Sequence, residues 1–323
     1  MSQPNRPVDK FGFPIPVTFD DVPGARKGFR LPESRHSRRW VGILAAFLVV
    51  GVLAIGVWKK ARGVFAEMHE AHAMEHYWDE NYPAAMAEMD TAISWQPDKR
   101  LDRYVTRAKI RLQNRDLDGA LTDVNHVIET VKEKQGRAIL IVSDALVMRS
   151  MVHRRRGESD EAIKDCTTAL EMDSGKEPTL LNHRAYYRAL ANVELDKALV
   201  DIQATLTAHG VDDPTQANSE DDAALLDTRG FVFFRLEKNT EALADIEAAI
   251  KLTNQHHERI DGMQFPPQQS RYKESSLREI EKNLAVMYEH RGLIQEALGN
   301  AEQAKSDHAQ AKKLGYDPAN GVE

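Results

Sequence analysis

Three histidines near residue 70 have the spacing of metal ligands on a helix. His69, His72 and His76 lie at i, i+3 and i+7, so a helix places all three on one face. The pair His72/His76 has the i, i+4 spacing that chelates zinc or copper, and Glu75 and Asp79 lie near it. One straight helix seldom completes a coordination sphere. We therefore prefer to interpret these histidines as packing residues and keep a metal site as the alternative.

The rest of the sequence lacks the usual signatures of catalysis. It contains no HExxH motif, P-loop, nucleophile elbow or GxGxxG motif. Cys166 is the only cysteine, which excludes an intrachain disulfide and a cysteine-based zinc site. Its apolar position in the pattern predicts a small core residue. We expect a protein that is not an enzyme and that carries no cofactor.

The composition and the charge distribution exclude several further classes. The chain has 323 residues, of which 42% are hydrophobic and 29% charged, so it is neither collagen-like nor disordered throughout. The net charge of −7 is unevenly distributed, because residues 1–39 hold eight Lys/Arg against four Asp/Glu and the remainder is acidic. A nucleic-acid-binding domain is more often basic, so no nucleic-acid partner is expected.

Residues 40–58 form an apolar run with the properties of a membrane span. The run WVGILAAFLVVGVLAIGVW contains no charge and has tryptophan at both ends. As a helix it is about 28 Å long, close to the thickness of the hydrocarbon core. A buried core helix is rarely apolar on every face, and a cleavable signal peptide has a shorter leader. The run therefore predicts a single-pass transmembrane helix over 40–58.

The flanking sequence predicts how this helix is oriented. Six Lys/Arg lie in the twenty residues before the run, and Lys59, Lys60 and Arg62 follow it. The excess favours a cytoplasmic N-terminus and an extracytoplasmic C-terminal region. Residues 1–39 contain six prolines and no helical or strand periodicity, which predicts a disordered basic tail. Its charges either only set the topology, which we prefer, or also contact anionic lipid.

From residue 66 onward the sequence repeats a pattern of small residues. In the first unit Ala73 is followed twelve residues later by Ala85, then by Ala92 and Pro97. This spacing resembles the tetratricopeptide repeat, in which small residues lie where two antiparallel helices touch and a proline ends the second helix. The six units fall near 66–97, 101–132, 143–174, 179–210, 223–254 and 285–318.

The resemblance implies an all-α fold, a right-handed solenoid of about six helical hairpins over residues 66–318. In the fourth unit Tyr186 occupies the place of the small residue, which predicts a first helix shifted by one position. The extra residues around Val131–Ile139, His209–Asp222 and Thr253–Lys273 are predicted to be connectors, with binding loops as the alternative.

Opposite charges also recur in the units. An acidic residue lies three positions after the alanine of each second helix, and an arginine precedes the small residue of most first helices. The acidic residues are Glu88, Asp123, Asp165, Asp201, Asp245 and Asp307, and the arginines are Arg107, Arg149, Arg229 and Arg291, with Arg184 displaced by one. We interpret them as structural ion pairs rather than as a row of acid–base groups.

The resemblance also implies a concave groove, lined by the first helices, that binds a peptide or a partner helix. The corresponding residues are Tyr77, Trp78, Lys109, Met151, Arg154, Arg155, Arg184, Tyr187, Phe231, Phe234 and Arg235. Cations and aromatic rings suit an extended ligand that has carboxylates or backbone carbonyls and apolar side chains. The alternative is an ordinary solvated helix face.

Together these features predict a membrane-anchored scaffold or adaptor that binds a protein or peptide segment in its groove. Two alternatives remain. A self-associating structural membrane protein would form a homo-oligomer through small residues of the span, such as Gly42 and Ala46. A metal-binding protein would use the face formed by His69, His72 and His76.

Overall fold

The computed structural model describes residues 35–97, 99–134, 139–172, 177–266 and 270–316. Over these residues the chain forms twelve α-helices, one 3-10 helix and no strand, which confirms the all-α prediction. Most of the predicted tail, residues 1–34, lies outside the described residues, as do residues 135–138 of one predicted connector. The chain divides into two compact units, residues 1–61 and 62–323.

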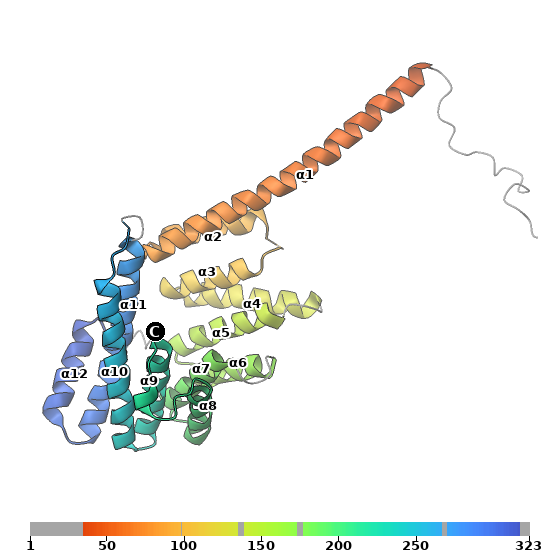
Figure 1. Ribbon diagram of the computed structural model, residues 1–323. Helices are drawn as coiled ribbons and strands as arrows, with labels where there is room; N and C mark the ends of the chain where they lie inside the picture. The colour runs from red at the N-terminus through yellow and green to blue at the C-terminus, as the bar shows by residue number, and fades with distance from the viewer. Residues whose placement is uncertain (1–34, 98, 135–138, 173–176, 267–269, 317–323) are drawn as a thin grey trace, which may run out of the picture. The chain divides into compact units, whose positions relative to one another are not determined.

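The helices follow one another along the chain with short connections (Figure 1). Their bounds are α1 (Arg35–Trp78), α2 (Tyr82–Trp95), α3 (Asp102–Gln113), α4 (Leu117–Lys134), α5 (Ile139–Arg155), α6 (Ser159–Met172), α7 (Pro178–Ala191), α8 (Leu195–Ala208), η2 (Pro214–Gln216), α9 (Glu220–Arg235), α10 (Asn239–Gly262), α11 (Ser270–Ala297) and α12 (Ala301–Lys313).

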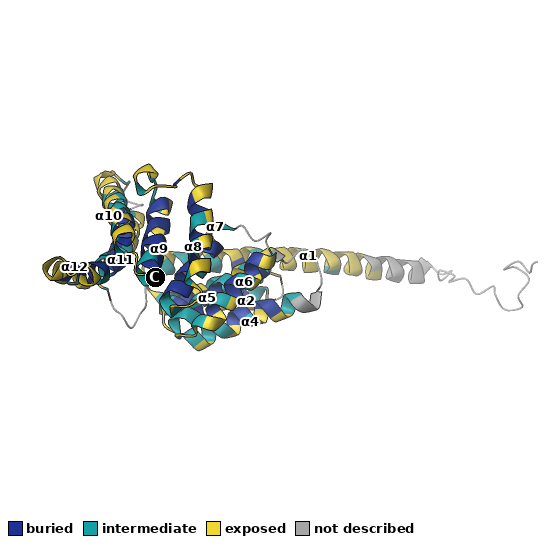
Figure 2. Cartoon of the chain, turned by 90° about the horizontal axis from the view of Figure 1, so that it is seen from below, coloured by how far each residue is buried: buried dark blue, intermediate teal, exposed yellow. Residues whose placement is uncertain are grey.

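In the first unit the described structure is the N-terminal part of α1. Its apolar side chains between residues 43 and 58 are exposed, with Leu44 at 66% and Phe47 at 71% (Figure 2). The side chains of residues 35–42 and 45 lie outside the described set. Among the residues that could be searched, no helix combines the length and the hydropathy of a membrane span. The transmembrane helix over 40–58 therefore stays a prediction.

In the second unit the helices pair as six antiparallel hairpins, α1/α2 to α11/α12 (Figure 1). Each hairpin turn contains a residue in the left-handed region, with φ between 56° and 81°. These residues are Glu80, Arg115, Gly157, Asn192, Glu237 and Gly299. Gly157 and Gly299 adopt this conformation without a steric penalty.

Small residues allow the two helices of each hairpin to touch, as the repeat predicts. On the first helices these are Ala73, Ala108, Ser150, Ala185, Gly230 and Gly292, all buried. The predicted shift in the fourth hairpin is confirmed, because Ala185 is fully buried in place of Tyr186. The extra residue of this hairpin lies in its turn, where Glu194 is a second left-handed residue after Asn192, and it displaces Asp201 by one position.

The hydrophobic core is divided. One continuous cluster runs from α3 to α11 and contains Cys166, which is fully buried as predicted. Burial raises the pKa of the Cys166 thiol to about 11. A second, smaller cluster holds the first hairpin together through Ala73, Ala85 and Met89, and it reaches Ile110 of α3. The first hairpin therefore rests on a core of its own.

Helices α10 and α11 continue into the segment 253–273 that the sequence analysis assigned to a connector. Helix α10 extends to Gly262 and α11 begins at Ser270. The N-terminal half of α11 reaches the end of α1, where Arg271 lies 3.1 Å from Asp79 and Arg278 lies 3.3 Å from Glu80. These contacts bring the start of α11 beside the end of α1.

Candidate functional site

The recurrent charges form ion pairs within five of the six hairpins, which confirms their structural interpretation. In each pair the arginine of the first helix donates two hydrogen bonds to the aspartate of the second, at 2.5–2.9 Å. The pairs are Arg107–Asp123, Arg149–Asp165, Arg184–Asp201, Arg229–Asp245 and Arg291–Asp307. Both functional groups of each pair are engaged in holding two helices together.

The pair in the fifth hairpin is the most deeply buried. The side chains of Arg229 and Asp245 are 4% and 2% exposed. Burial raises the pKa of Asp245 even though the Arg229 guanidinium beside it acts in the opposite direction. In the third hairpin the hydrogen bond to Asp165 raises the pKa of Arg149. Desolvation of a buried pair thus offsets much of its electrostatic attraction.

A cavity of about 670 Å³ lies on the inner side of the array. It is lined by the first helices of all six hairpins and by the end of α10. The lining residues are Tyr77, Trp78, Lys109, Gln113, Met151, Arg154, Asn182, His183, Tyr186, Tyr187, Glu220, Ala224, Asp227, Thr228, His256, Ile260, Ser275, Ser276, Glu279, Ile280, Lys282, Asn283, Val286 and Met287. Its volume is typical of a ligand-binding cavity.

Six of the eleven predicted groove residues line this cavity. They are Tyr77, Trp78, Lys109, Met151, Arg154 and Tyr187. The ammonium group of Lys109 lies 5.2 Å from the ring centre of Tyr77, and the Tyr77 and Trp78 rings meet edge to face at 5.3 Å. These three residues from α1 and α3 form one aromatic and cationic corner of the cavity.

The other five predicted groove residues do not line the cavity. Arg184 is engaged with Asp201, and Phe231 is buried in the core, with Phe234 packed beside it. Arg155 and Arg235 are the last residues of α5 and α9. Each donates to a carbonyl near the end of the preceding first helix, to Leu112 at 2.8 Å and to Ala189 at 3.0 Å respectively. These five side chains thus make contacts within the array: the three arginines through hydrogen bonds and the two phenylalanines through packing.

Several residues that line the cavity were missed by the sequence analysis. The carboxamide oxygen of Asn182 and the hydroxyl of Tyr186 are buried there and have no hydrogen-bond partner among the described residues. Burial raises the pKa of Tyr186 well above its usual range. The residues from α10 and α11 were missed because the repeat pattern placed the sixth unit at residue 285. The helical spacing of the apolar residues Leu277, Ile280 and Leu284 was the available signal.

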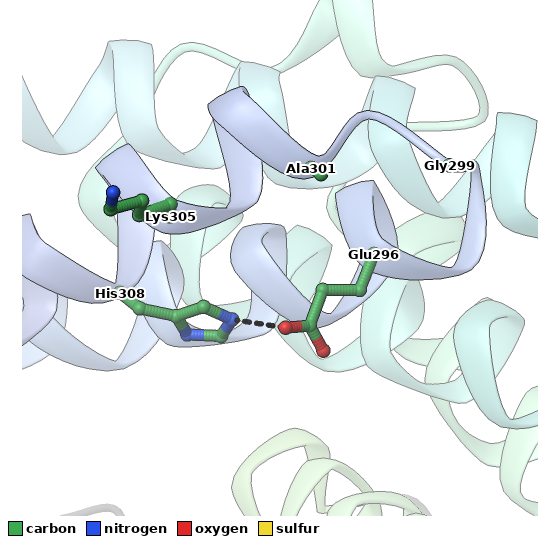
Figure 3. A pocket seen from close by; sticks show the side chains of 5 residues that line it. All are labelled: Glu296, Gly299, Ala301, Lys305 and His308. Carbon is green, nitrogen blue, oxygen red and sulfur yellow. Dashed lines mark ion pairs between the residues drawn. The ribbon is translucent and has the colours of Figure 1, made fainter.

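A smaller cavity of about 380 Å³ lies at the turn of the last hairpin (Figure 3). Glu296, Gly299, Ala301, Lys305 and His308 line it. His308 lies 2.8 Å from Glu289 and 3.4 Å from Glu296. Burial acts to lower the pKa of His308, but the two glutamates more than offset this effect and raise it. This cavity lies within one hairpin, and its volume is smaller than that of the inner cavity.

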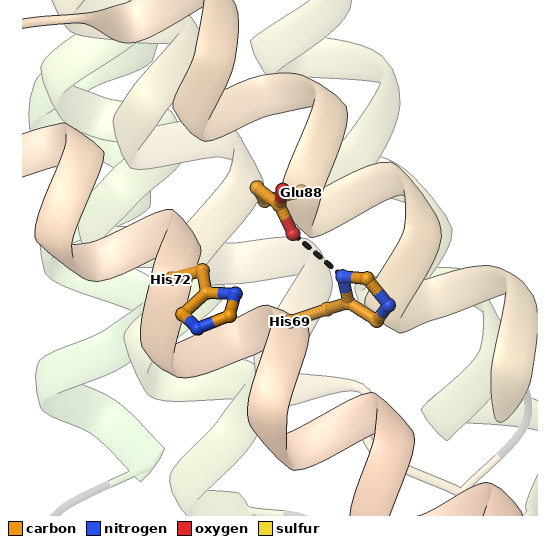
Figure 4. Close-up of side chains that lie close together, drawn as sticks. All are labelled: His69, His72 and Glu88. Carbon is orange, nitrogen blue, oxygen red and sulfur yellow. Dashed lines mark hydrogen bonds and ion pairs between the residues drawn. The ribbon is translucent and has the colours of Figure 1, made fainter.

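The three histidines of the first hairpin do not all come together. His69 and His72 lie beside Glu88 of α2, with their possible ligand atoms within 4.8 Å of one another (Figure 4). His76 lies outside this cluster. The sequence pattern thus identified two members of this cluster, His69 and His72. The third member is the carboxylate of Glu88 on α2.

Comparisons with known proteins agree with a fold of stacked helical hairpins. No family model matches the chain. Over 119 residues the chain is 34% identical to "Tetratricopeptide repeat protein 36" of Xenopus tropicalis, and the match covers 36% of this chain and 55% of that relative. The chain thus spans about half the length of this curated relative.

Two solved structures show the same fold at low identity. The apo form of RapI matches with a TM-score of 0.54 and 10% identity, over 77% of this chain and 97% of that chain. BtubC from P. vanneervenii matches with a TM-score of 0.50 and 16% identity, over 78% and 94%. The chain is an all-α helical solenoid, and the curated match supports its resemblance to tetratricopeptide repeats.

Proposed function

We propose that this chain is a membrane-anchored scaffold, rather than an enzyme, and that its inner cavity binds a segment of another protein. The apolar part of α1 would fix the protein in the membrane, with the N-terminus in the cytoplasm and the helical array outside. Holding the array at a surface confines its partner to that surface and raises the effective concentration of the partner.

Two buried polar groups of α7 carry the proposal for the cavity. Asn182 offers a carbonyl oxygen that accepts a hydrogen bond, and the Tyr186 hydroxyl both donates and accepts. Buried polar groups usually have hydrogen-bond partners, and these two line the cavity without one among the described residues. The main chain of a bound peptide offers both N–H donors and carbonyl acceptors to such groups.

The corner formed by Tyr77, Trp78 and Lys109 suits the rest of such a segment. Trp78 is 40% exposed, so its ring is accessible to an apolar side chain. The Lys109 ammonium lines the same cavity, and an ammonium group pairs with a carboxylate through charge-assisted hydrogen bonds. Tryptophan and tyrosine are among the residue types that dominate binding energy at protein interfaces.

The exposed apolar surface of α1 supports the membrane anchor. Leu48, Val52, Leu53 and Val57 are each more than 60% exposed. Soluble proteins rarely expose a contiguous apolar surface of this kind without a partner or a membrane. Alkaline extraction of membranes carrying the full chain tests the anchor. The protein should stay in the pellet, and Leu48→Arg with Leu53→Arg should release it, because a charged side chain at the middle of a span costs about 2.5–3.5 kcal/mol.

Crosslinking followed by affinity purification tests the cavity. The intact chain is compared with a variant that carries Trp78→Ala and Lys109→Glu, which changes one corner and leaves the core untouched. Lys164→Glu in α6 is the matched charge control, because Lys164 is exposed and lies outside the cavity. Partners lost from the first variant and kept by the control would support the proposal.

An identical set of partners in all three proteins would contradict binding in the cavity. If the shared set contains only the chain itself, self-association through α1 replaces the scaffold as the better explanation. Helical circular dichroism and gel filtration of each variant establish that a lost partner does not reflect unfolding.

A further inference from the structure

The first hairpin departs from the others at the position of the charge pair. In four hairpins an arginine and an aspartate 16 residues apart in sequence form this pair, and in the fourth hairpin the separation is 17. In the first hairpin the residues at the 16-residue spacing are His72 and Glu88. A guanidinium is thus replaced by an imidazole, and the carboxylate lies on a side chain one methylene longer.

A second imidazole accompanies this replacement. The Nδ1 atom of His69 lies 2.6 Å from a carboxylate oxygen of Glu88, and the His69 and His72 rings lie edge to face with their centres 6.4 Å apart. Figure 4 shows the ion pair between His69 of α1 and Glu88 of α2, with His72 on the same helix as His69. The corresponding position of the second hairpin is Tyr104 and that of the fifth is Leu226, so the paired imidazoles are particular to the first hairpin.

We propose that His69, His72 and Glu88 bind a divalent transition-metal ion of the zinc class. Two imidazoles and one carboxylate are a ligand set that zinc accepts in proteins, with water or another ligand in the remaining position. Carboxylate and imidazole atoms within 4.8 Å of one another need only small side-chain adjustments to meet one ion. This site lies outside the inner cavity and does not depend on the scaffold function.

Charge balance favours an ion at this position. In the other hairpins the guanidinium brings a fixed positive charge beside the carboxylate, and in the first hairpin a metal ion held by the two imidazoles would bring positive charge beside Glu88. Arg100 and Arg103, at the start of the next hairpin, are engaged with a different carboxylate, Glu70, at 3.4 and 2.8 Å.

Access and rigidity also suit a binding site. The His69 and Glu88 side chains are 24% and 30% exposed, and His72 is exposed, so an ion can reach them from solvent. His72 makes no hydrogen bond within the described part of the chain, which leaves both of its ring nitrogens available. The site joins α1 to α2, and the buried Ala73, Ala85 and Met89 hold these two helices together beside it.

Titration calorimetry of the full chain in detergent tests the proposal. The protein is first treated with EDTA, exchanged into metal-free buffer and then titrated with ZnCl2. We expect saturable binding of one zinc ion per chain. His72→Gln and Glu88→Gln should each weaken the binding more than about tenfold, since even the loss of groups that only orient metal ligands has an effect of this size.

His76→Gln is the matched control, because His76 lies on the same helix one turn beyond His72 and outside the cluster. Its zinc affinity should equal that of the unmodified chain, and the circular dichroism of all variants should be unchanged because the substituted side chains lie outside the core. The proposal is overturned if the unmodified chain binds no zinc stoichiometrically, if His72→Gln binds as tightly, or if His76→Gln weakens binding to the same extent.

Discussion

The first hairpin and the five that follow use the same position for different purposes. In α3/α4 to α11/α12 the position holds an arginine–aspartate pair that joins two helices, whereas the first hairpin has His72 and Glu88 there. The first hairpin also rests on its own small core, apart from the cluster that runs from α3 to α11. In a repeat array an internal unit packs against a neighbour on each side, so its charged residues are constrained by two interfaces. The last hairpin is also terminal and keeps the Arg291–Asp307 pair, so the departure at His72 and Glu88 belongs to the first hairpin and not to terminal hairpins in general.

The largest effect on stability is expected when a buried charge is removed from an internal hairpin. Arg229→Met should lower the free energy of unfolding by about 3–5 kcal/mol, because it leaves the Asp245 carboxylate buried without a cation. Urea unfolding followed by circular dichroism measures the change. The equivalent substitution in the first hairpin, His72→Gln, should cost less than about 0.5 kcal/mol, because that side chain is exposed.

A double variant separates the buried charge from lost packing. Arg229→Met combined with Asp245→Leu should recover most of the loss, since buried ion pairs are often replaced by apolar residues without net cost. If the double variant is as unstable as Arg229→Met alone, the uncompensated carboxylate is not the cause. The two hairpins would then differ in packing rather than in the role of their charges.

A smaller effect on stability is expected from adding a methyl group at Gly230, the residue of the fifth hairpin that corresponds to Ala73 of the first. A Cβ atom on Gly230 would lie 2.8 Å from a side-chain carbon of Ile246 and 3.2 Å from the carbonyl oxygen of Ala242. Overpacking of this kind costs about 1–3 kcal/mol. The better helix propensity of alanine offsets about 1 kcal/mol of this cost. Gly230→Ala should therefore destabilise the protein by about 1 kcal/mol net.

Thermal unfolding checks this prediction against Gly262→Ala at the end of α10. A Cβ atom at Gly262 would meet nothing within 4 Å, so that substitution should leave the midpoint unchanged or raise it. The same position in the first hairpin is Ala73, which is fully buried and already carries the methyl group. Equal effects of the two glycine substitutions would show that the close helix contact in the fifth hairpin is not limiting.

The sequence predicted the hairpins well because their determinants are local. The twelve-residue interval from Ala73 to Ala85, and its recurrence, depends on helical periodicity and on the size of single residues at one contact. The shift at Tyr186 was also visible, because Arg184 is displaced by one residue in the same unit. Charge pairs follow from the same spacing, and the structure confirms them.

The inner cavity was only partly predictable because it depends on contacts between distant hairpins. A template of equal units assigned residues 253–273 to a connector, whereas α10 and α11 continue into that segment and α11 lines the cavity. Phe231 was predicted to lie in the groove, and its burial beside His290 depends on the neighbouring hairpin. Similarly, the sequence identified Glu88 as the counterpart of the aspartates. That Glu88 lies beside the histidines follows only from its distance of 2.6 Å from His69 in the structure.

Converting the first hairpin to the common pattern tests the comparison directly. His72→Arg with Glu88→Asp places an arginine and an aspartate at the 16-residue spacing of the other hairpins. Because this position is partly exposed, the new pair should stabilise the protein by only about 0–1 kcal/mol, measured by urea unfolding. The same variant should no longer bind zinc in the calorimetric titration. A clear loss of stability would mean that the helices α1 and α2 do not meet as the internal pairs do.

The smallest expected effect concerns the last hairpin, which keeps the Arg291–Asp307 pair and adds a histidine beside it. Burial acts to lower the pKa of His308, but Glu289 and Glu296 outweigh it, so the pKa is raised in the folded state. A raised pKa means that the folded protein holds the proton more tightly than the unfolded chain. The stabilisation is fully present below about pH 6.5, the unfolded value, and is lost as the pH rises through the folded value.

His308→Gln should therefore reduce stability at pH 5.5 more than at pH 8.5, with urea midpoints at both values as the measurement. The side chain is 29% exposed and its partners are near solvent, so the difference should stay within about 0–1 kcal/mol. Lys305 also lines this cavity, and Lys305→Gln is the matched control for the loss of another cationic side chain at the same place. A difference of equal size at both pH values would mean that His308 acts through packing against Gly292, where its ring leaves no room for a Cβ atom.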